Sequence, residues 1–320
     1  MKIVVLDGRP LAAERSDWKP LESLGELEVY PHTPAGEIRE RTAGAAILVT
    51  NKARIGAEIL EAQPGPRYVT VTATGYDCVD VATARRLGVP VSNVPEYGTG
   101  SVAQYVFALL LELCHRTALH GAAVQSGQWT NQPDFSLRKT RLVELEGKTL
   151  GVVGLGRIGR GVGELGRSFG MRLIHHGRSR PGSGPDAESW RTLDALFAES
   201  DVISLHCPMN EQTAGLVNRH RLALLKPTAF LINTARGGLV NELELAAALS
   251  DGQLAGAAVD VVSIEPIRPD NPLLEAPNCL ITPHIAWATE EARARLMRAT
   301  AANIAAFLAG RPINVVNSAE

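Results

Sequence analysis

The stretch 149–159, TLGVVGLGRIG, decides the fold of this chain. A short apolar run leads into the pattern Gly-x-Gly-x-x-Gly, and apolar residues at helical spacing follow as far as Phe169. A strand, a glycine turn and a helix in this order are the context in which the pattern binds the pyrophosphate of a dinucleotide. Gly154 permits the tight turn, Gly156 lets the backbone approach the anion, and Gly159 allows the helix to pack on the strand. The sequence therefore predicts a dinucleotide-binding α/β domain.

The residues after the next apolar run, 171–175, indicate which dinucleotide binds. A site for NAD places Asp or Glu here, where the carboxylate accepts a hydrogen bond from the ribose 2′-hydroxyl. Gly177 stands there instead, followed by Arg178, Ser179 and Arg180, which offer two cations and a hydroxyl to a 2′-phosphate. The alternative is a solvated basic loop, because surface arginines are common. We favour NADP(H) as the preferred cofactor, with NAD(H) as a second one.

Length and composition set the class of protein. The chain has 320 residues, of which 45% are apolar and 21% charged, and its formal net charge is −2. These values are typical of a globular chain long enough for two domains. A nucleic-acid-binding or polybasic membrane-binding protein would carry an excess of Lys and Arg, so we expect small molecules and copies of the chain itself as partners. The four cysteines have no metal-binding spacing and are expected to be reduced packing residues, so no metal site is predicted.

The N-terminus and the longest apolar stretch bear on the compartment. Residues 1–7 resemble a first buried strand and not a signal peptide. The stretch 102–114 contains Gln104 and Glu112 and is too short to span a bilayer, so it is predicted to be a buried helix. The expected compartment is the cytoplasm.

Apolar runs alternate with helical patterns along the whole chain. A first series of strands is expected at 3–6, 46–50, 68–73 and 89–93, and a second series at 149–153, 172–175, 202–205, 229–233, 256–262 and 279–282. Helices are expected at 102–120, between the two series, and at 290–308 after the last strand. This order predicts two Rossmann-like or flavodoxin-like, doubly wound parallel-sheet α/β domains with a cleft between them. We expect a discontinuous substrate-binding domain formed by 1–98 and 290–320, and a dinucleotide-binding domain formed by 99–289.

Three chemically active residues follow successive strands of the second series. Arg236, Glu265 and His284 each come shortly after a strand, and ligands of doubly wound sheets gather at these carboxyl ends. Each residue taken singly has an ordinary structural explanation, such as a surface ion pair or a solvated carboxylate. Their joint occurrence at neighbouring strand ends favours one active site. Arg236 could bind a carboxylate through its planar guanidinium.

At this point the motifs carry a family resemblance. They are VGLGRIG (153–159), NTARGG (233–238), DVVSIEP (260–266), TPHIAW (282–287) and, earlier in the chain, ATGYD (73–77) and NVPEY (93–97). Together they resemble the D-isomer-specific 2-hydroxyacid dehydrogenases over nearly the whole chain. Within that family they are most similar to the branch of hydroxypyruvate reductase, glyoxylate reductase and glycerate dehydrogenase. Two departures from the usual pattern of the family stand out: Gly177 replaces the ribose-binding acid, which bears on the cofactor, and the aromatic residue common near 262 or 263 is absent, which bears on the size of the substrate. The choice between glyoxylate and hydroxypyruvate is therefore open.

The resemblance implies an oxidoreductase that acts on a CH–OH group and reduces small 2-oxo acids to D-2-hydroxy acids. His284 would donate the proton, Glu265 would orient and tune the histidine, and Arg236 would bind the substrate carboxylate. The implied substrate-binding residues are Asn51, Thr74, Gly75, Tyr76, Arg236, His284 and Trp287. The implied cofactor-binding residues are Gly154, Leu155, Gly156, Arg157, Ile158, Gly159, Gly177, Arg178, Ser179, Arg180, Cys207, Pro208, Thr213, Thr234, Ala235 and Asp260.

Further expectations and alternatives accompany this interpretation. The segment 124–141 is expected to be an arm that crosses a homodimer interface, partly because dimers are usual in the family. Trp287 fits ordinary packing as well as a pocket wall, and Cys207 fits a buried structural role as well as a place beside the cofactor. The functional alternatives are an NAD-linked dehydrogenase of lactate, phosphoglycerate or another 2-hydroxy acid, and a nucleotide-sensing module without catalysis, as in corepressors related to the family.

Overall fold

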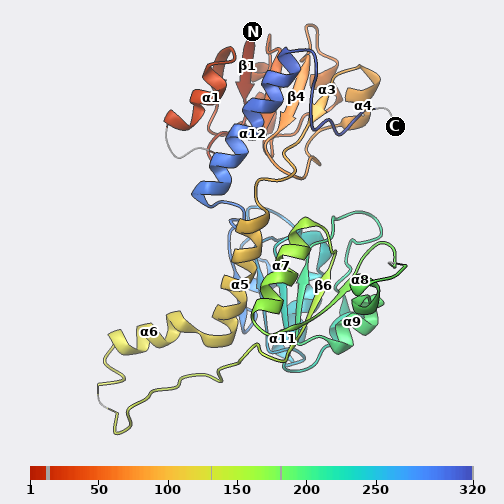
Figure 1. The fold of residues 1–320 in the computed structure, drawn as a ribbon. Helices are drawn as coiled ribbons and strands as arrows, with labels where there is room; N and C mark the ends of the chain where they lie inside the picture. Colours follow the sequence, from red (N-terminus) through yellow and green to blue (C-terminus); the bar gives the residue numbers. More distant parts are fainter. Residues whose placement is uncertain (12–14, 131, 181, 319–320) are drawn as a thin grey trace. The chain divides into compact units, whose positions relative to one another are not determined.

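The computed structural model of the chain describes residues 1–11, 15–130, 132–180 and 182–318. The chain divides into two compact units (Figure 1). Unit 1 comprises Met1–Gly98 and Ala288–Glu320, and unit 2 comprises Thr99–Trp287. The chain therefore passes from unit 2 back to unit 1 after residue 287. The sequence analysis expected this boundary after residue 289. Each unit is an α/β structure on a parallel sheet, which confirms the predicted fold class.

Unit 1 contains a five-stranded parallel sheet in the order β2-β1-β3-β4-β5. The strands are β1 (Lys2–Val5), β2 (Glu26–Val29), β3 (Ile47–Thr50), β4 (Tyr68–Val71) and β5 (Val91–Ser92). The helices are α1 (Lys19–Glu22), α2 (Ile38–Arg41), α3 (Ala57–Leu60), α4 (Val81–Arg86) and α12 (Glu290–Leu308). The last of these contacts β4, so the end of the chain completes the unit that the first residues begin (Figure 1).

The strand β2 is a correction to the sequence analysis, which predicted four strands in this unit. Its sequence is ELEV, and it pairs with β1 at the edge of the sheet, where its residues are half-buried or exposed. Charged residues on an edge strand prevent unwanted pairing with other chains. They also break up the apolar run by which a strand is recognised in a sequence, and this strand was therefore missed.

Unit 2 contains a six-stranded parallel sheet in the order β11-β10-β9-β8-β6-β7. The strands are β6 (Thr149–Val153), β7 (Arg172–His176), β8 (Val202–Leu205), β9 (Phe230–Asn233), β10 (Gly256–Val259) and β11 (Cys279–Ile281). The helices are α5 (Thr99–His115), α6 (Thr117–Gln125), α7 (Arg157–Ser168), α8 (Pro185–Ser189), α9 (Leu193–Glu199), α10 (Arg219–Leu222) and α11 (Glu242–Ser250). The predicted strand 256–262 ends earlier, at Val259, and the residues after it enter the loop of the candidate site.

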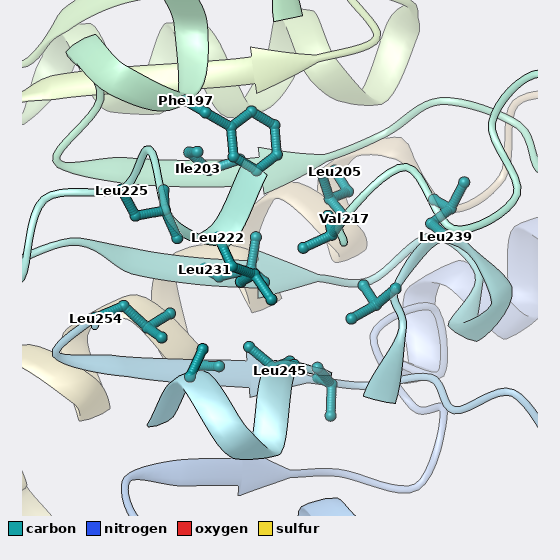
Figure 2. Packing of buried hydrophobic residues seen from close by; sticks show 14 of the residues in the cluster. Phe197, Ile203, Leu205, Val217, Leu222, Leu225, Leu231, Leu239, Leu245 and Leu254 are labelled. Atoms are coloured by element: carbon teal, nitrogen blue, oxygen red, sulfur yellow. The ribbon is translucent and has the colours of Figure 1, made fainter. Parts of the chain in front are cut away.

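Two apolar clusters cover the two faces of this sheet. Leu231 belongs to a cluster with Phe197 and Leu245 (Figure 2). Its neighbour Ile232 belongs to a cluster with Leu110 of α5. Because successive side chains of a strand point to opposite faces, the clusters lie on opposite sides of the sheet. Burial on both faces explains why these strands appear in the sequence as continuous apolar runs. The sheet is therefore a rigid base for the loops at its carboxyl edge.

The helix expected at 102–120 is interrupted in the structure. It begins earlier, at Thr99, and ends at His115, and α6 starts after Arg116. Arg116 adopts a left-handed backbone conformation with φ of 48°, which ends the hydrogen-bonded ladder. Neither Gly nor Pro marks this break, so it could not be predicted from the residue pattern. Within the described part of the chain, no helix is both long and apolar enough to cross a membrane.

Candidate active site

The glycine turn after β6 has the geometry that the sequence predicts. Gly154 has a φ of +98°, and a Cβ there would lie 2.7 Å from the amide nitrogen of Cys207. A Cβ on Gly159 would lie 2.1 Å from the carbonyl oxygen of Gly154, so helix α7 packs directly against the turn. A Cβ on Gly156, in contrast, would meet no atom within 4 Å. Two glycines are therefore required by close packing, and the third borders open space.

This turn fits the anionic centre of a dinucleotide. Helix α7 begins at Arg157, and the residue before it, Gly156, makes no side-chain capping hydrogen bond. The first amide groups of a helix attract anions through unpaired N–H groups and the helix dipole. After β9, the hydroxyl oxygen of Thr234 is buried without a hydrogen-bond partner among the described residues. A bound group that supplies an acceptor or donor here would satisfy it.

The basic segment after β7 is exposed. Gly177 is half-buried, and Arg178, Ser179 and Arg180 are exposed. The guanidinium carbon of Arg180 lies over the ring of Trp190, 5.6 Å from its centroid, within the range of a cation–π contact. The residue types and exposure suit the recognition of a phosphate dianion.

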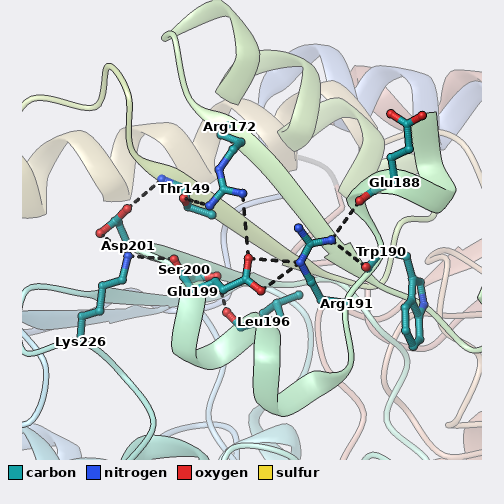
Figure 3. A network of polar contacts seen from close by, with 10 residues as sticks. All are labelled: Thr149, Arg172, Glu188, Trp190, Arg191, Leu196, Glu199, Ser200, Asp201 and Lys226. Carbon is teal, nitrogen blue, oxygen red and sulfur yellow. Dashed lines mark hydrogen bonds and ion pairs between the residues drawn. The ribbon is translucent and has the colours of Figure 1, made fainter.

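Arg191, which follows the basic segment, is bonded both to strand β7 and to helix α9. The amide of Arg191 donates to the carbonyl oxygen of His175 at 2.8 Å, and its guanidinium binds Glu199 through Nε at 3.0 Å (Figure 3). Arg172 at the start of β7 lies 3.9 Å from the same carboxylate. Asp186, the first acid after β7, pairs with Arg160 at 2.9 Å, and this contact lowers the pKa of the Asp186 carboxyl. The segment 177–190 is thus fixed at its end by charged contacts.

His284 and Glu265 form a pair at the carboxyl edge of the sheet. Nδ1 of His284 lies 2.7 Å from Oε2 of Glu265, and the two side chains are 24% and 34% exposed. A carboxylate can only accept a hydrogen bond, so Nδ1 is the donor. This fixes the tautomer and leaves Nε2 as the nitrogen that can exchange a proton with another molecule. Partial exposure keeps the imidazole accessible to a small ligand.

Asp260 holds the loop that carries the histidine. Its buried carboxylate accepts hydrogen bonds from the amides of Ile285 at 2.9 Å and Ala286 at 2.8 Å, and from the hydroxyl of Thr282 at 2.6 Å. Its carbonyl oxygen accepts from the amide of His284 at 2.7 Å. The sequence assigned Asp260 to the cofactor. The structure adds that it positions His284, and its contact with a cofactor stays a prediction.

Arg236 follows β9 in a loop that is locked to the loop carrying Glu265. The side chain of Asn233 donates to the carbonyl oxygen of Arg236 at 2.9 Å and accepts from the amide of Ala235 at 3.0 Å. A Cβ on Gly237 would lie 1.9 Å from the carbonyl carbon of Val262, so no larger residue fits between the two loops. The structure thus brings the loops of Arg236 and Glu265 into backbone contact.

The remaining predicted residues of unit 2 lie near these loops. The indole nitrogen of Trp287 donates to the carbonyl oxygen of His284 at 3.0 Å. Cys207 and Pro208 begin the turn after β8, which the hydroxyl of Thr213 closes by donating to the carbonyl oxygen of Pro208 at 2.7 Å. Burial raises the pKa of the Cys207 thiol to about 11, so the thiol is protonated at neutral pH and the structural interpretation of this cysteine is favoured.

One neighbouring histidine is unsuited to acid catalysis. Burial lowers the pKa of His206 to about 3, so its imidazole is neutral at physiological pH. It contacts the hydroxyl of Ser204 at 2.8 Å. His206 is therefore a packing residue next to the glycine turn, and the role of His284 as proton donor stays a prediction.

The predicted substrate-binding residues of unit 1 follow β3 and β4. The side chain of Asn51 donates to the carbonyl oxygen of Thr72 at 2.7 Å. The hydroxyl of Thr74 donates to the carbonyl oxygen of Val94 at 3.2 Å. Gly75 is half-buried, and Tyr76 is 37% exposed. Their contact with a substrate stays a prediction.

Sequence reasoning missed Asp7, which organises the first of these loops. This buried carboxylate accepts hydrogen bonds from the amides of Asn51 at 2.7 Å and Ala53 at 2.8 Å, and from the amide of Lys52 between them. Its place directly after β1 was a usable signal, because polar residues at strand ends gather on one edge. Among the described residues, no group of acidic, histidine and cysteine side chains could hold a metal ion.

Comparisons with known proteins show which family this chain is related to. Residues 107–286 match the model of the D-isomer specific 2-hydroxyacid dehydrogenase family, NAD binding domain. The chain is 45% identical over 321 residues to a hydroxypyruvate reductase of Blautia hydrogenotrophica, covering 99% of this chain and 100% of the relative. It is 40% identical over 268 residues to a glyoxylate reductase of Aeropyrum pernix, covering 82% and 80% of the two chains.

Among solved structures, the chain is similar to an NADPH-dependent glyoxylate/hydroxypyruvate reductase of Sinorhizobium meliloti in complex with NADP and malonate. The two are 27% identical, with a TM-score of 0.85 over 98% of this chain and 96% of the other.

Proposed function

The chain belongs to the D-isomer-specific 2-hydroxyacid dehydrogenase family, and from this premise we propose that it reduces glyoxylate and hydroxypyruvate with a preference for NADPH. Family membership makes it an oxidoreductase that acts on a CH–OH group. The observation that carries the proposal is the pair of His284 and Glu265, held at 2.7 Å on the loops that follow β11 and β10 of the sheet that also carries the glycine turn.

His284, Glu265 and Arg236 have separate roles in the proposed reduction. When bound, the reduced nicotinamide would supply a hydride to the keto carbon of the substrate. Nε2 of His284 donates a proton to the keto oxygen, which becomes the hydroxyl, while Glu265 stabilises the imidazolium through Nδ1. Arg236 binds the substrate carboxylate through its planar guanidinium. A 2-oxo acid, NADPH and one proton thus yield a 2-hydroxy acid and NADP⁺, and neutral ketones are poor substrates.

The names of the relatives support the substrate class. A hydroxypyruvate reductase and a glyoxylate reductase are both similar to this chain over most of its length. Both substrates are small 2-oxo acids, which the proposed roles of Arg236 and His284 accommodate. A panel of small 2-oxo acids, tested with NADPH and with NADH by loss of nicotinamide absorbance, tests the proposal. Turnover of glyoxylate and hydroxypyruvate is expected, and absence of turnover across the panel would favour a nucleotide-sensing module.

The cofactor preference rests on the segment after β7. Gly177 carries no carboxylate to repel a 2′-phosphate, and Arg178, Ser179 and Arg180 are exposed at the point where that phosphate is expected. A relative in complex with NADP has a similar fold. The contact of Arg180 with Trp190 restricts the flexible guanidinium, which lowers the entropy lost on binding.

The double variant Arg178→Ala/Arg180→Ala should bind NADPH about 10- to 100-fold more weakly. A hydrogen bond to a charged group contributes about 1.5–3 kcal/mol, and solvent screening of these two exposed arginines reduces their combined contribution to about that of one such bond. Its affinity for NADH should change by less than about threefold. Titration calorimetry without substrate measures both constants. The variant Arg67→Ala/Arg311→Ala, which removes two exposed arginines of unit 1, is the matched control. An equal loss for both cofactors would contradict the assignment.

The proposal also includes a homodimer formed through the arm 124–141. The arm 124–141, of which residue 131 lies outside the described residues, extends from α6 away from the sheet of unit 2 (Figure 1). It exposes large apolar side chains, with Phe135 at 92% and Trp129 at 47% of their area. Exposed apolar patches of this kind mark interfaces, so we expect a second copy to cover the arm.

Sedimentation at micromolar concentration should therefore give a mass of about two chains, and Phe135→Ser/Trp129→Ser should shift the equilibrium toward one chain because large apolar residues dominate such interfaces. Leu243→Ser, at an exposed leucine of α11, is the control and should leave the mass unchanged. A wild-type protein with the mass of one chain would exclude this arm as a stable interface.

A further inference from the structure

The loop that carries Glu265 is attached to helix α11 by one carboxylate. Glu242, the first residue of that helix, accepts hydrogen bonds from the amide of Ser263 at 2.5 Å and from its hydroxyl at 2.9 Å. Its Oε2 also accepts from the side-chain amide of Asn271 at 2.9 Å. Both of its oxygens are thus used to hold the segment 262–271. Hydrogen bonds to an ionised carboxylate are stronger than bonds between neutral groups.

The attachment lies two residues from the partner of the proposed proton donor. Glu265 uses Oε2 to bind Nδ1 of His284, and its other oxygen accepts from the amide of Val262 at 3.4 Å. The amide of the next residue, Ser263, is the one that Glu242 holds. On the other side, the backbone of Val262 is packed against Gly237. The backbone that sets the position of the Glu265 carboxylate is therefore fixed by Gly237 and Glu242.

We propose that Glu242 is a positioning residue that sets the Glu265 carboxylate against His284 by anchoring Ser263. The proposal rests on the proposed function, because it assigns Glu242 to the same proton-transfer site. Glu242 acts through Ser263 and Glu265.

Glu244 provides the control for a purely structural role of Glu242. An acid in the first turn of a helix stabilises the helix through its dipole, and Glu244 in the same turn of α11 shares that effect. Glu244 accepts a hydrogen bond from the amide of Arg219 at 2.6 Å, which lies outside the segment 262–271. Glu244→Gln therefore removes a similar charge from the same helix turn without touching the loop of Glu265.

The isosteric change Glu242→Gln is the informative one. A carboxamide keeps one acceptor oxygen, and its NH₂ group can only donate. If the carboxamide oxygen faces the amide of Ser263, its NH₂ group faces the side-chain NH₂ of Asn271, while the hydroxyl of Ser263 can turn to accept. In the reverse orientation the NH₂ group faces the amide of Ser263, so either orientation sets two donors against each other and the loop moves to avoid it. Ser263→Ala removes only the hydroxyl bond and keeps the amide bond, so its effect should be smaller.

A double-mutant cycle with Glu265→Gln measures whether Glu242 acts through Glu265. Glu242→Gln should lower kcat for glyoxylate about tenfold, the size expected when hydrogen bonds to a charged group are lost, and the dissociation constant of NADPH should change less than about twofold. In the Glu265→Gln background, Glu242→Gln should lower kcat less than about twofold, because coupled residues have non-additive effects. Glu244→Gln should match the wild type.

A wild-type kcat for Glu242→Gln, or a full tenfold loss in both backgrounds, would overturn the proposal. Thermal denaturation checks that the variants are folded. If Glu242→Gln does not fold, Asn271→Ala and Ser263→Ala take its place in the cycle, since each removes one bond to the same carboxylate.

A second readout requires no turnover. Since Glu265 accepts from Nδ1, ¹⁵N spectra of the wild type should show His284 protonated at Nδ1 in its neutral form. Glu242→Gln should shift His284 toward the mixed tautomers of Glu265→Gln, and Glu244→Gln should not. An unchanged His284 spectrum in Glu242→Gln would contradict the positioning role. If the spectra change as expected and the wild type reduces no 2-oxo acid, the proposed function fails while the positioning stands.

Discussion

Replacement of His284 by alanine should lower kcat for glyoxylate and hydroxypyruvate by about 10²- to 10⁴-fold, which is the usual contribution of a general acid. The alkoxide that forms as hydride arrives would then take its proton from water. The affinity for NADPH should change by less than about twofold, because the imidazole is separate from the glycine turn that holds the pyrophosphate. Steady-state rates and a cofactor titration of the same preparation measure the two quantities.

A surface histidine provides the control for this change. His220 of α10 is exposed and pairs with Asp194 at 3.1 Å, so His220→Ala alters a similar contact between an imidazole and a carboxylate away from the candidate site. It should retain the wild-type kcat. If His284→Ala turned over at the wild-type rate, the proton would have to come from another group, and the roles of His284 and Glu265 would both be wrong.

Replacement of Arg236 by lysine should lower kcat/KM for glyoxylate by about 10²-fold, although the charge is kept. An ammonium group cannot bind a carboxylate through two parallel hydrogen bonds, so both binding and orientation of the substrate suffer. Arg236→Ala should cost about tenfold more. A rise in KM together with a fall in kcat would show that the guanidinium acts in both the bound and the reacting state.

Arg219→Lys is the matched control for this series, because this arginine is exposed on α10. It should leave kcat/KM unchanged. A lysine variant at 236 that kept full kcat/KM would show that the planar guanidinium is unnecessary, and the substrate carboxylate would then have to bind elsewhere.

The elements that could be predicted from the sequence are those whose signals are local. Helix α12 has the bounds that were expected, because Thr289 caps it through a side-chain bond to the amide of Ala292 and acids follow in the first turn. The inner strands of unit 2, β6, β8, β9 and β10, were expected because they are buried on both faces. Strand β2, exposed at an edge, and the break at Arg116 lacked such signals, and both were missed.

The same distinction holds at the candidate site. The family was recognised from motifs beside the strands, and the comparisons confirm it. The strand-end rule also led to Glu265 and His284, which the structure brings together. Asp7 and Glu242 hold loops that are remote in sequence, and the second role of Asp260 appears only in the folded chain. A sequence shows which residues can form hydrogen bonds, and the fold decides which of them meet.

In the proposed reaction this chain transfers a hydride from NADPH to a 2-oxo acid and a proton from His284 to the resulting oxygen. The decisive experiment is the reduction of hydroxypyruvate by NADPH, followed by chiral analysis of the product. We predict that each NADPH oxidised yields one D-glycerate and that His284→Ala nearly abolishes the reaction. NADPH that stays unoxidised, or a product of the L configuration, would contradict the proposed reaction.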